Sequence, residues 1–378
     1  MKTEQPKIIV TRLLSAAGIT VNGNNPWDIQ VYDEKFYQKV LVSGSLGMGE
    51  SYMENYWDCT KLDDFFLRVL RANLDTSIQH NLPFKLEILL ARIFNYQSLS
   101  KAHHNSSRHY DIGNDFFKQM LDRRLTYTCA FWKNAHTLDE AQEHKLDLTC
   151  RKLNLKAGMH VLDIGCGWGS FAKFAAEKYG VQVTGITVSS EQAKLARELC
   201  KGLPIDIRLM DYRLLDEKFD AIASLGMFEH VGYKNYGTYM KVVHHCLKED
   251  GLFLLHTIGG NKPSTFTDQW LNKYIFPNAM IPSISRIGQF IEGLFVMEHW
   301  QNFSINYDKT LMAWYENISL NWDKLKTKYD QTFFRMWKYY LLSCAGSFRA
   351  RNSQLWQIVL SPKGVAGGYR YDHQPGDD

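Results

Sequence analysis

The sequence of 378 residues has no paired cysteine motif and no long apolar run. Its seven cysteines are scattered and odd in number, and no two have CxxC spacing. This pattern predicts neither a zinc site nor a disulfide framework, and it fits a reducing cytosol. No run of 18 apolar residues occurs, and the N-terminus MKTEQPKIIV has no hydrophobic signal segment. Any membrane contact is therefore expected to be peripheral.

A strong charge of either sign is also missing, because 44 basic and 40 acidic residues leave a formal net charge of +4. No long basic run with interleaved glycine or aromatic residues occurs, which argues against a nucleic-acid partner. The basic excess lies in residues 321–351, where seven basic residues stand against two acidic ones. That segment predicts either a solvated face or a surface that meets an anionic membrane, where each cation contributes about 1 kcal/mol.

The first 94 residues predict a small helical domain. Apolar residues recur at helical spacing in three short segments: 35–42, 63–74 and 84–94. The Gly/Ser-rich run SGSLGMGESY (43–52) predicts a connector between the first two helices. Residues 95–108 are polar and aperiodic, which predicts a linker.

Residues 109–378 predict an α/β domain, a doubly wound Rossmann-like sheet that is mostly parallel. Strands are expected at 160–165, 181–187, 205–210, 219–225 and 251–258, and helices at 169–179, 190–201 and 236–249. The proline-containing segment 259–293 predicts an inserted lid. Further helices are expected at 308–320 and 332–349. Strands at 294–303 and 354–361 are expected to close the sheet as an antiparallel edge.

The run HVLDIGCGWG (160–169) is the most informative stretch of the sequence. An apolar strand ends in Asp163, three alternating glycines follow (Gly165, Gly167 and Gly169), and a helix pattern begins at once. Strand, glycine-rich turn and helix form the nucleoside- or phosphate-binding corner of doubly wound folds. Glycine permits a close approach of the backbone to a ligand, where a Cβ atom would clash.

The ligand of this loop can be inferred from charge. A dinucleotide site expects G-x-G-x-x-G and an acidic residue at the end of the second strand, whereas this chain has G-x-G-x-G and Thr187. Asp163 can instead receive a cationic group, which S-adenosylmethionine has and a pyrophosphate lacks. Asp211 can accept a hydrogen bond from the adenine amino group, and Tyr212 can flank the ring; alternatively, both belong to a surface loop after the third strand.

Ten runs spread over nearly the whole chain carry a family resemblance: SLGMGESYMENYWD (45–58), HYDIGNDFF (109–117), YTCAFW (127–132), VLDIGCGWGS (161–170), DYR (211–213), GMFEHVG (226–232), LLHTIG (254–259), NKYIFPN (272–278), DKTLMAWYE (308–316) and CAGSFRARNSQLWQ (344–357). In these runs the chain resembles the cyclopropane-fatty-acyl-phospholipid synthase family. Mycolic acid cyclopropane synthases share the catalytic half and as a rule lack the N-terminal extension.

The resemblance implies an enzyme that transfers a methylene group from S-adenosylmethionine to a cis double bond of a phospholipid acyl chain. It implies that residues 1–94 associate with lipid, that the enzyme lies in the cytoplasm on the inner face of the membrane, and that it is a homodimer. Two other functions remain open. One is a methyltransferase acting on an amine or lipid without ring closure, and the other is a non-catalytic S-adenosylmethionine-binding protein at the membrane.

The resemblance also implies residue roles. The expected cofactor contacts are Tyr127, Thr128, Asp163, Gly165, Cys166, Gly167, Gly169, Thr187, Gln192, Asp211 and Tyr212. The expected bicarbonate site is Cys129, Glu229, His256, the backbone of Ile258, and Tyr307. Aromatic residues that would surround a carbocation are Tyr274, Phe276, Trp314 and Tyr315. Cys344 is a further catalytic candidate, although a methyl-cysteine intermediate is chemically unnecessary and a structural role is favoured.

The bicarbonate residues also have structural interpretations. Glu229 can be the N-terminal carboxylate of a helix, His256 a hydrogen-bonded core histidine, and Cys129 a small buried apolar residue. Their wide separation in the sequence gives no ligand spacing for a metal, and none is expected.

Overall fold

The computed structural model describes residues 4–72, 112–264, 267–374 and 377. The helix predicted at 84–94 and the linker predicted at 95–108 lie outside the described residues. Among the described residues, no helix is both long and apolar enough to span a bilayer.

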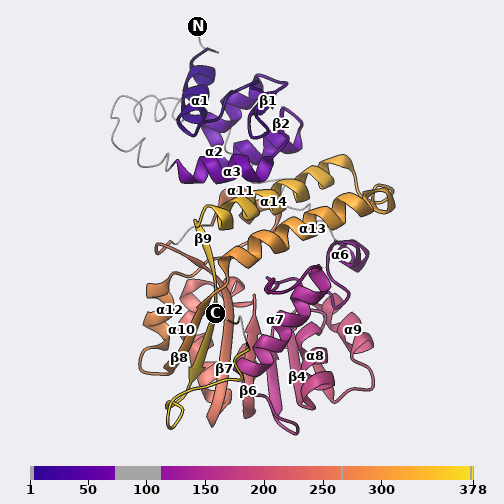
Figure 1. Ribbon diagram of the computed structural model, residues 1–378, viewed down its shortest axis with the longest axis vertical. Helices are drawn as coiled ribbons and strands as arrows, with labels where there is room; N and C mark the ends of the chain where they lie inside the picture. The colour runs from indigo at the N-terminus through magenta and orange to yellow at the C-terminus, as the bar shows by residue number, and fades with distance from the viewer. Residues whose placement is uncertain (1–3, 73–111, 265–266, 375–376, 378) are drawn as a thin grey trace. The chain divides into compact units, whose positions relative to one another are not determined.

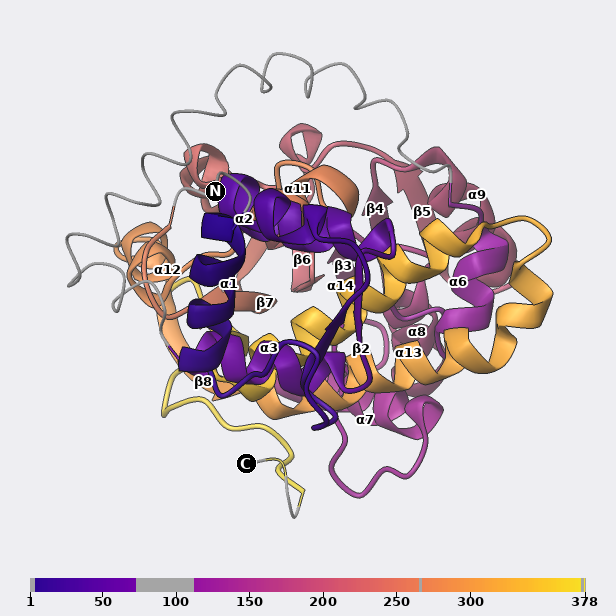
Figure 2. The same cartoon turned by 90° about the horizontal axis from the view of Figure 1, so that it is seen from above.

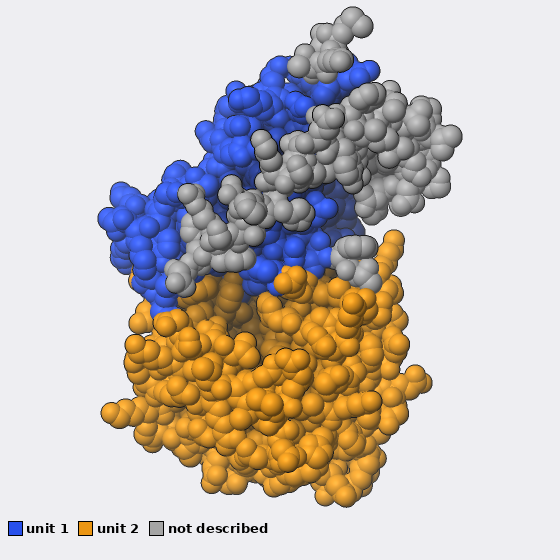
Figure 3. Space-filling view, turned by 180° about the vertical axis from the view of Figure 1, so that it is seen from behind, with its two compact units in different colours: residues 1–116, 267–277, 311–352 blue, residues 117–266, 278–310, 353–378 orange. Residues whose placement is uncertain are grey.

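The chain forms two compact units (Figure 3). Unit 1 contains residues 1–116, 267–277 and 311–352, and unit 2 contains residues 117–266, 278–310 and 353–378. The sequence did not predict that two later segments join the N-terminal residues in unit 1. The predicted lid, 259–293, divides between the two units.

Unit 1 is built from helices and one small pair of strands (Figure 1). Its described elements are α1 (Glu4–Ala16), β1 (Ile29–Val31), α2 (Lys35–Met53), β2 (Trp57–Cys59), α3 (Leu62–Arg71), α11 (Gln269–Tyr274), α14 (Gln331–Arg349) and most of α13 (Ser304–Leu325). Helix α6 (Asn114–Met120) crosses the boundary between the units. Strands β1 and β2 pair antiparallel. The long helices α13 and α14 lie side by side in Figures 1 and 2. The ring centroids of Trp322 on α13 and Phe334 on α14 are 4.7 Å apart.

The connector predicted at residues 43–52 is wrong, because α2 continues through it with a kink at Gly44 (φ 54°). The glycines allow close packing instead of a turn. A Cβ atom on Gly49 would lie 2.3 Å from the Trp270 ring of α11, and one on Gly47 would lie 2.0 Å from the Lys39 carbonyl oxygen. Local composition predicted a turn here, but contact with a tryptophan more than 200 positions away explains Gly49.

The basic surface predicted at residues 321–351 is only partly exposed. Lys324, Lys326, Lys328 and Arg351 are exposed, but other cations of the segment are covered or paired. Arg335 is buried and donates to Asp58 at 2.7 Å. Arg349 reaches both Asp63 and Asp64 at 2.7 Å, and Lys328 pairs with Asp115 at 2.9 Å. Four carboxylates from outside the segment therefore neutralise most of its excess charge.

Gly346 provides a stability test of unit 1. A Cβ atom at this position in α14 would lie 2.6 Å from the Asp63 carbonyl oxygen and 2.7 Å from the Phe66 Cβ of α3. Because backbone cannot move aside easily, Gly346→Ala should destabilise the protein by about 1–3 kcal/mol in denaturant unfolding. The matched control is Gly288→Ala in α12 (Ile284–Ile291), where a Cβ atom meets nothing within 4 Å. The control should be neutral or stabilising by up to about 1 kcal/mol; equal effects of the two changes would contradict the packing argument.

Unit 2 contains a seven-stranded sheet with the order β5-β4-β3-β6-β7-β9-β8. The strands are β3 (His160–Ile164), β4 (Gln182–Thr187), β5 (Ile205–Leu209), β6 (Phe219–Leu225), β7 (Leu247–Gly260), β8 (Val296–Asn302) and β9 (Ser353–Ser361). Strands β3 to β7 are parallel, β9 pairs antiparallel with β7, and β8 pairs antiparallel with β9. The predicted fold class is confirmed, including the antiparallel edge.

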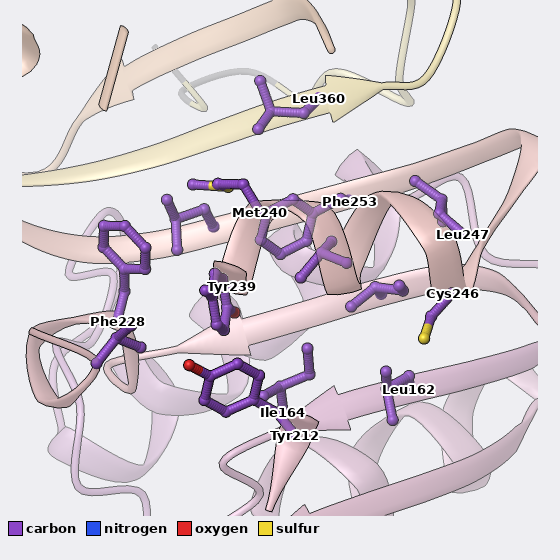
Figure 4. Packing of buried hydrophobic residues seen from close by; sticks show 14 of the residues in the cluster. Leu162, Ile164, Tyr212, Phe228, Tyr239, Met240, Cys246, Leu247, Phe253 and Leu360 are labelled. Carbon is purple, nitrogen blue, oxygen red and sulfur yellow. The ribbon is translucent and has the colours of Figure 1, made fainter. Parts of the chain in front are cut away.

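Helices cover both faces of this sheet. Leu162 and Ile164 point into a core cluster with α10 (Tyr236–Cys246) and α12, part of which Figure 4 shows. Val161 points to the opposite face, into a cluster with α7 (Leu138–Lys152) and α8 (Ser170–Tyr179). Helix α9 (Ser190–Leu199) packs beside β4 and β5. Since alternate residues of a strand face opposite sides, β3 is apolar on both faces and lies at the centre of the sheet.

Candidate active site

The glycine loop connects β3 to α8 at the carboxyl edge of the parallel strands. Gly165, Gly167 and Gly169 have φ angles of 81°, 55° and 83°, a region that residues with a Cβ atom rarely adopt. A Cβ atom on Gly165 would lie 2.7 Å from Met227 in the loop after β6, whereas one on Gly167 meets nothing within 4 Å. The middle glycine therefore faces open space, as a ligand-binding loop requires.

Asp163 lies at the base of this loop and is 2% exposed. Its Oδ2 atom has no hydrogen-bond partner among the described residues. Burial raises the pKa of Asp163 to about 7, although the nearby Lys145 charge opposes this shift. Buried polar oxygens are normally hydrogen-bonded, so the unpartnered oxygen suits a cationic group of a bound ligand.

Lys145, which was not among the predicted site residues, supports the loop that contains Thr128. Its side chain is fully buried on α7, and Nζ donates to Thr128 Oγ1 at 2.9 Å. Burial lowers the pKa of Lys145 to about 8, opposed mainly by Asp122. A signal was present in the sequence: Lys145 and Lys152 are seven positions apart, so they share one helix face with Leu146 and Thr149.

Thr187 and Gln192 lie together, as a shared cofactor contact requires. Thr187 ends β4, and its hydroxyl donates to Gln192 Oε1 at 3.1 Å. Ser189 caps α9 by accepting from the Gln192 backbone amide. Because the oxygen of the Gln192 carboxamide is engaged in this way, its N–H groups are the part suited to a ribose hydroxyl.

Asp211 and Tyr212 of the DYR motif make more contacts with other residues of the protein than was predicted. Both oxygens of Asp211 accept from the Arg213 guanidinium, at 2.9 and 2.7 Å, and the same hydrogen bond lowers the pKa of Asp211. Tyr212 lies in the core cluster shown in Figure 4, with its ring 5.2 Å from that of Tyr239. Contacts of both residues with adenine stay a prediction.

The remaining predicted cofactor residues differ in their surroundings. The rings of Tyr127 and Trp168 both contact that of Phe117, at 5.4 and 4.9 Å, so an aromatic group lies beside the glycine loop. Cys166 packs inward with Ala193 and neighbouring apolar residues. Only the backbone of Cys166 is therefore placed for a ligand.

Glu229 follows β6 in a short 3-10 helix (Phe228–His230) and is 6% exposed. Its Oε1 atom accepts from the Ile258 backbone amide at 2.6 Å, while Oε2 has no hydrogen-bond partner among the described residues. Burial raises the pKa of Glu229 to about 7. The Ile258 amide was predicted to bind bicarbonate, but in this structure it donates its hydrogen bond to Glu229.

His256 lies in the second half of β7, level with Leu225, the last residue of β6, and with Gln357 of β9. It is buried, and burial lowers its pKa well below the usual value, so the imidazole is neutral. Nδ1 lies 3.3 Å from Gln357 Nε2. Nε2 has no hydrogen-bond partner within the described ranges.

The loop that contains Cys129 is hydrogen-bonded to the start of α13, the helix that contains Tyr307. The Ala130 amide donates to Thr310 Oγ1 at 3.1 Å, and the Trp132 amide donates to Asn306 Oδ1 at 2.8 Å. Burial raises the pKa of the Cys129 thiol, which donates to the Ala130 carbonyl at 3.2 Å. Cys129 is therefore a neutral donor group and not a thiolate.

Phe303 links this loop to His256. Its ring centroid lies 5.2 Å from that of Phe131 and 5.8 Å from that of His256. All five residues predicted for the bicarbonate site belong to unit 2, as does the glycine loop.

The other catalytic candidates belong to unit 1: Cys344, Tyr274, Phe276, Trp314 and Tyr315. The Tyr274 hydroxyl donates to Glu50, and the Phe276 ring packs on Tyr340. Burial raises the pKa of the Cys344 thiol to about 12, which disfavours a nucleophilic role. Their roles at the reacting carbon stay predictions.

The raised pKa of Asp163 predicts a pH-dependent stability. The folded state holds this proton up to about pH 7, whereas the unfolded chain loses it near pH 4. The contribution of Asp163 is therefore complete below pH 4 and is lost as the pH rises through 7. The free energy of unfolding of Asp163→Asn is compared with that of the native protein, both without ligands. This difference should shift by about 2 kcal/mol in favour of the variant from pH 5 to pH 8. The exposed control Asp206→Asn should show no such gain; a flat difference for Asp163→Asn would contradict its burial as an acid.

Comparisons with known proteins agree with this arrangement. The family model of mycolic acid cyclopropane synthetase matches residues 97–358. The cyclopropane-fatty-acyl-phospholipid synthase of Escherichia coli (strain K12) is 52% identical over 362 residues, which make up 96% of this chain and 94% of that protein. A probable fatty acid methyltransferase of Pseudomonas putida is 38% identical over 277 residues, 70% of each chain.

Solved structures extend the similarity to the fold. The cyclopropane synthase MmaA2 from Mycobacterium tuberculosis superposes with a TM-score of 0.63 at 31% identity, covering 67% of this chain and 95% of that one. The mycolic acid cyclopropane synthase CmaA1, complexed with SAH and CTAB, gives 0.62 at 34% identity, with 67% and 95% covered. Coclaurine N-methyltransferase, at 23% identity and a TM-score of 0.64, shows the shared fold alone. The chain therefore belongs to the cyclopropane synthase family of S-adenosylmethionine-dependent methyltransferases.

Proposed function

We propose that this enzyme converts cis double bonds of unsaturated phospholipid acyl chains into cyclopropane rings. The observation that carries the proposal is the pair of buried polar atoms without partners among the described residues, Glu229 Oε2 and His256 Nε2. They lie at the same sheet edge as the glycine loop and Asp163. The Escherichia coli relative is named for this reaction and is similar along nearly its full length.

The glycine loop and Asp163 would hold S-adenosylmethionine, which supplies an electrophilic methyl carbon when bound. The open space at Gly167 and the unpartnered Asp163 oxygen fit such a ligand. Gln192 would orient the ribose through its amide N–H groups. Lys145 holds Thr128 in place through its hydrogen bond to the Thr128 hydroxyl.

An alkene is a poor nucleophile, and its attack on a methyl group leaves a cation on the acyl chain. Ring closure then requires loss of one C–H proton to a base that is weak and close. Glu229 and His256 would hold a bicarbonate ion, which supplies this base. Oε2 of Glu229 can accept from the bicarbonate hydroxyl, and His256 and Tyr307 can donate to its other oxygens. Cys129 would donate to bicarbonate only in place of its contact with the Ala130 carbonyl. Glu229 and His256 are buried, and such burial would limit access of water, which would otherwise trap the cation.

The enzyme must reach a double bond inside the bilayer. Drawing about ten methylene groups into water would cost about 8 kcal/mol, so direct transfer from bilayer to protein is favoured. We propose peripheral docking on the inner face of the membrane through the N-terminal residues. Since the cations at 321–351 are largely paired with carboxylates, apolar contact is the stronger candidate for this docking. The homodimer implied by the family resemblance stays a prediction.

Vesicles of an unsaturated phospholipid with methyl-labelled S-adenosylmethionine test the proposal. The released acyl chains should gain one CH₂ and lose the olefin signal. A gain of CH₂ with the olefin retained would indicate a methyltransferase without ring closure. Cofactor binding without any S-adenosylhomocysteine would indicate a non-catalytic binding protein, and either result overturns the proposal.

A further inference from the structure

We propose that Gln357 is a positioning residue that fixes His256 in the tautomer with the proton on Nε2. The inference rests on the proposed function in one respect, namely that His256 Nε2 faces a bound anion. Gln357 lies outside the residues predicted for the site. It is fully buried in β9, directly beside His256 in the β7–β9 register.

The Gln357 carboxamide makes three contacts with side chains of unit 2. Oε1 accepts from Lys152 Nζ at 2.9 Å. Nε2 lies 3.2 Å from Thr149 Oγ1 and 3.3 Å from His256 Nδ1. Lys152 is itself buried on α7, which lowers its pKa to about 7, and its Nζ also donates to Gln301 Oε1.

Two of these partners determine which end of the carboxamide faces His256. Lys152 Nζ has at least two N–H groups in either protonation state and lies 2.9 Å from Gln357, so the Gln357 atom beside it is the carbonyl oxygen. The Thr149 hydroxyl donates to the Lys145 carbonyl at 2.8 Å, so its lone pair faces Gln357 and requires a donor there. Both contacts place the Gln357 N–H groups toward Thr149 and His256.

The tautomer of His256 follows from this orientation. A neutral imidazole has one donor and one acceptor nitrogen. Because Gln357 donates to Nδ1, that nitrogen is the acceptor and Nε2 carries the proton. The N–H group at Nε2 has no partner among the described residues, and it can donate to an anion. The other tautomer would turn the lone pair of His256 Nε2 toward the anion. Two acceptors, Nε2 and an anion oxygen, would then face each other.

Gln357→Glu reverses the polarity of this contact with almost no change in shape. A carboxylate at residue 357 still accepts from Lys152, but it also accepts from the imidazole, which moves the proton to Nδ1. The matched control is Gln301→Glu, which places the same carboxylate against the same lysine away from His256. If Gln357→Glu does not fold, Gln357→Met removes the donor without adding a charge and should give a mixture of tautomers.

The test is a long-range ¹H–¹⁵N spectrum of the full chain with labelled histidine, in which His256→Asn identifies the His256 signals. Native protein and Gln301→Glu should show the Nε2–H tautomer, and Gln357→Glu should show Nδ1–H. Turnover of Gln357→Glu should fall about 10- to 100-fold, as for other residues that orient a ligand-binding histidine. Its affinity for S-adenosylmethionine should stay within twofold of the native value.

An unchanged tautomer in Gln357→Glu would overturn the inference, whatever the turnover. A changed tautomer with native turnover would support the role of Gln357 and overturn the proposed anion site. The spectrum is recorded without lipid or bicarbonate, so the failure of one proposal is distinguishable from the failure of the other.

Discussion

Replacing Glu229 by glutamine should lower turnover at least about 100-fold without weakening the binding of S-adenosylmethionine. The Ile258 amide donates to one side-chain oxygen of Glu229 at 2.6 Å, so it would select the carbonyl oxygen of a glutamine. The NH₂ group would then take the place of Oε2. The change therefore replaces the one unpartnered acceptor with a donor, and the bicarbonate hydroxyl would lose its partner. Steady-state methyl transfer to vesicle lipid and calorimetric titration of the cofactor measure the two effects separately.

Glu217→Gln is the matched control for this experiment. Glu217 is exposed and pairs with Arg208 on the surface, so the same chemical change there should leave turnover within about twofold of the native value, since surface pairs contribute little. If Glu229→Gln retains native turnover, the assignment of Glu229 to the anion site is wrong. If it loses cofactor binding as well, its role is structural.

Asp163→Asn should weaken the binding of S-adenosylmethionine about 30- to 100-fold. The carboxylate is buried, and one oxygen has no partner among the described residues. A hydrogen bond to a charged group contributes about 1.5–3 kcal/mol, and the asparagine supplies no compensating charge. Calorimetric titration at pH 8, where Asp163 is ionised, gives the largest difference because burial raises its pKa to about 7.

A comparison with S-adenosylhomocysteine identifies the group that Asp163 receives. The α-ammonium group is common to both ligands, whereas the sulfonium charge belongs to S-adenosylmethionine alone. An equal loss for both ligands assigns Asp163 to the α-ammonium group, and a loss for S-adenosylmethionine alone assigns it to the sulfonium. Native affinity for both ligands would contradict any role of Asp163 in binding, and the exposed Asp206→Asn provides the reference.

The sheet was predictable because its signals are local. Apolar runs of five to seven residues alternate with helical segments, and β3, β4, β5 and β6 begin and end within one residue of the predicted strands. The glycine loop was equally clear, since positive φ angles at Gly165, Gly167 and Gly169 require glycine wherever the rest of the chain lies.

The errors arose where one local pattern has two possible causes. The glycines at 43–52 resemble a turn, but Gly49 makes room for Trp270. The cations of 321–351 resemble a free basic surface, but Arg335 and Arg349 pair with carboxylates near residue 60. The composition of a short segment does not indicate which residues from distant parts of the chain pack against it.

The sequence by itself determined the sheet and the glycine loop, since periodicity and glycine spacing are properties of short segments. Glu229 and His256 were candidates because the runs that contain them resemble a known family. Only the tertiary structure decided how these groups are protonated and oriented. Lys145 and Lys152 are buried because α7 lies on the sheet, and His256 faces Gln357 because β9 returns beside β7. Those contacts join residues that are up to about 200 positions apart; a hydrogen-bond direction depends on both partners, so neither segment alone could specify it.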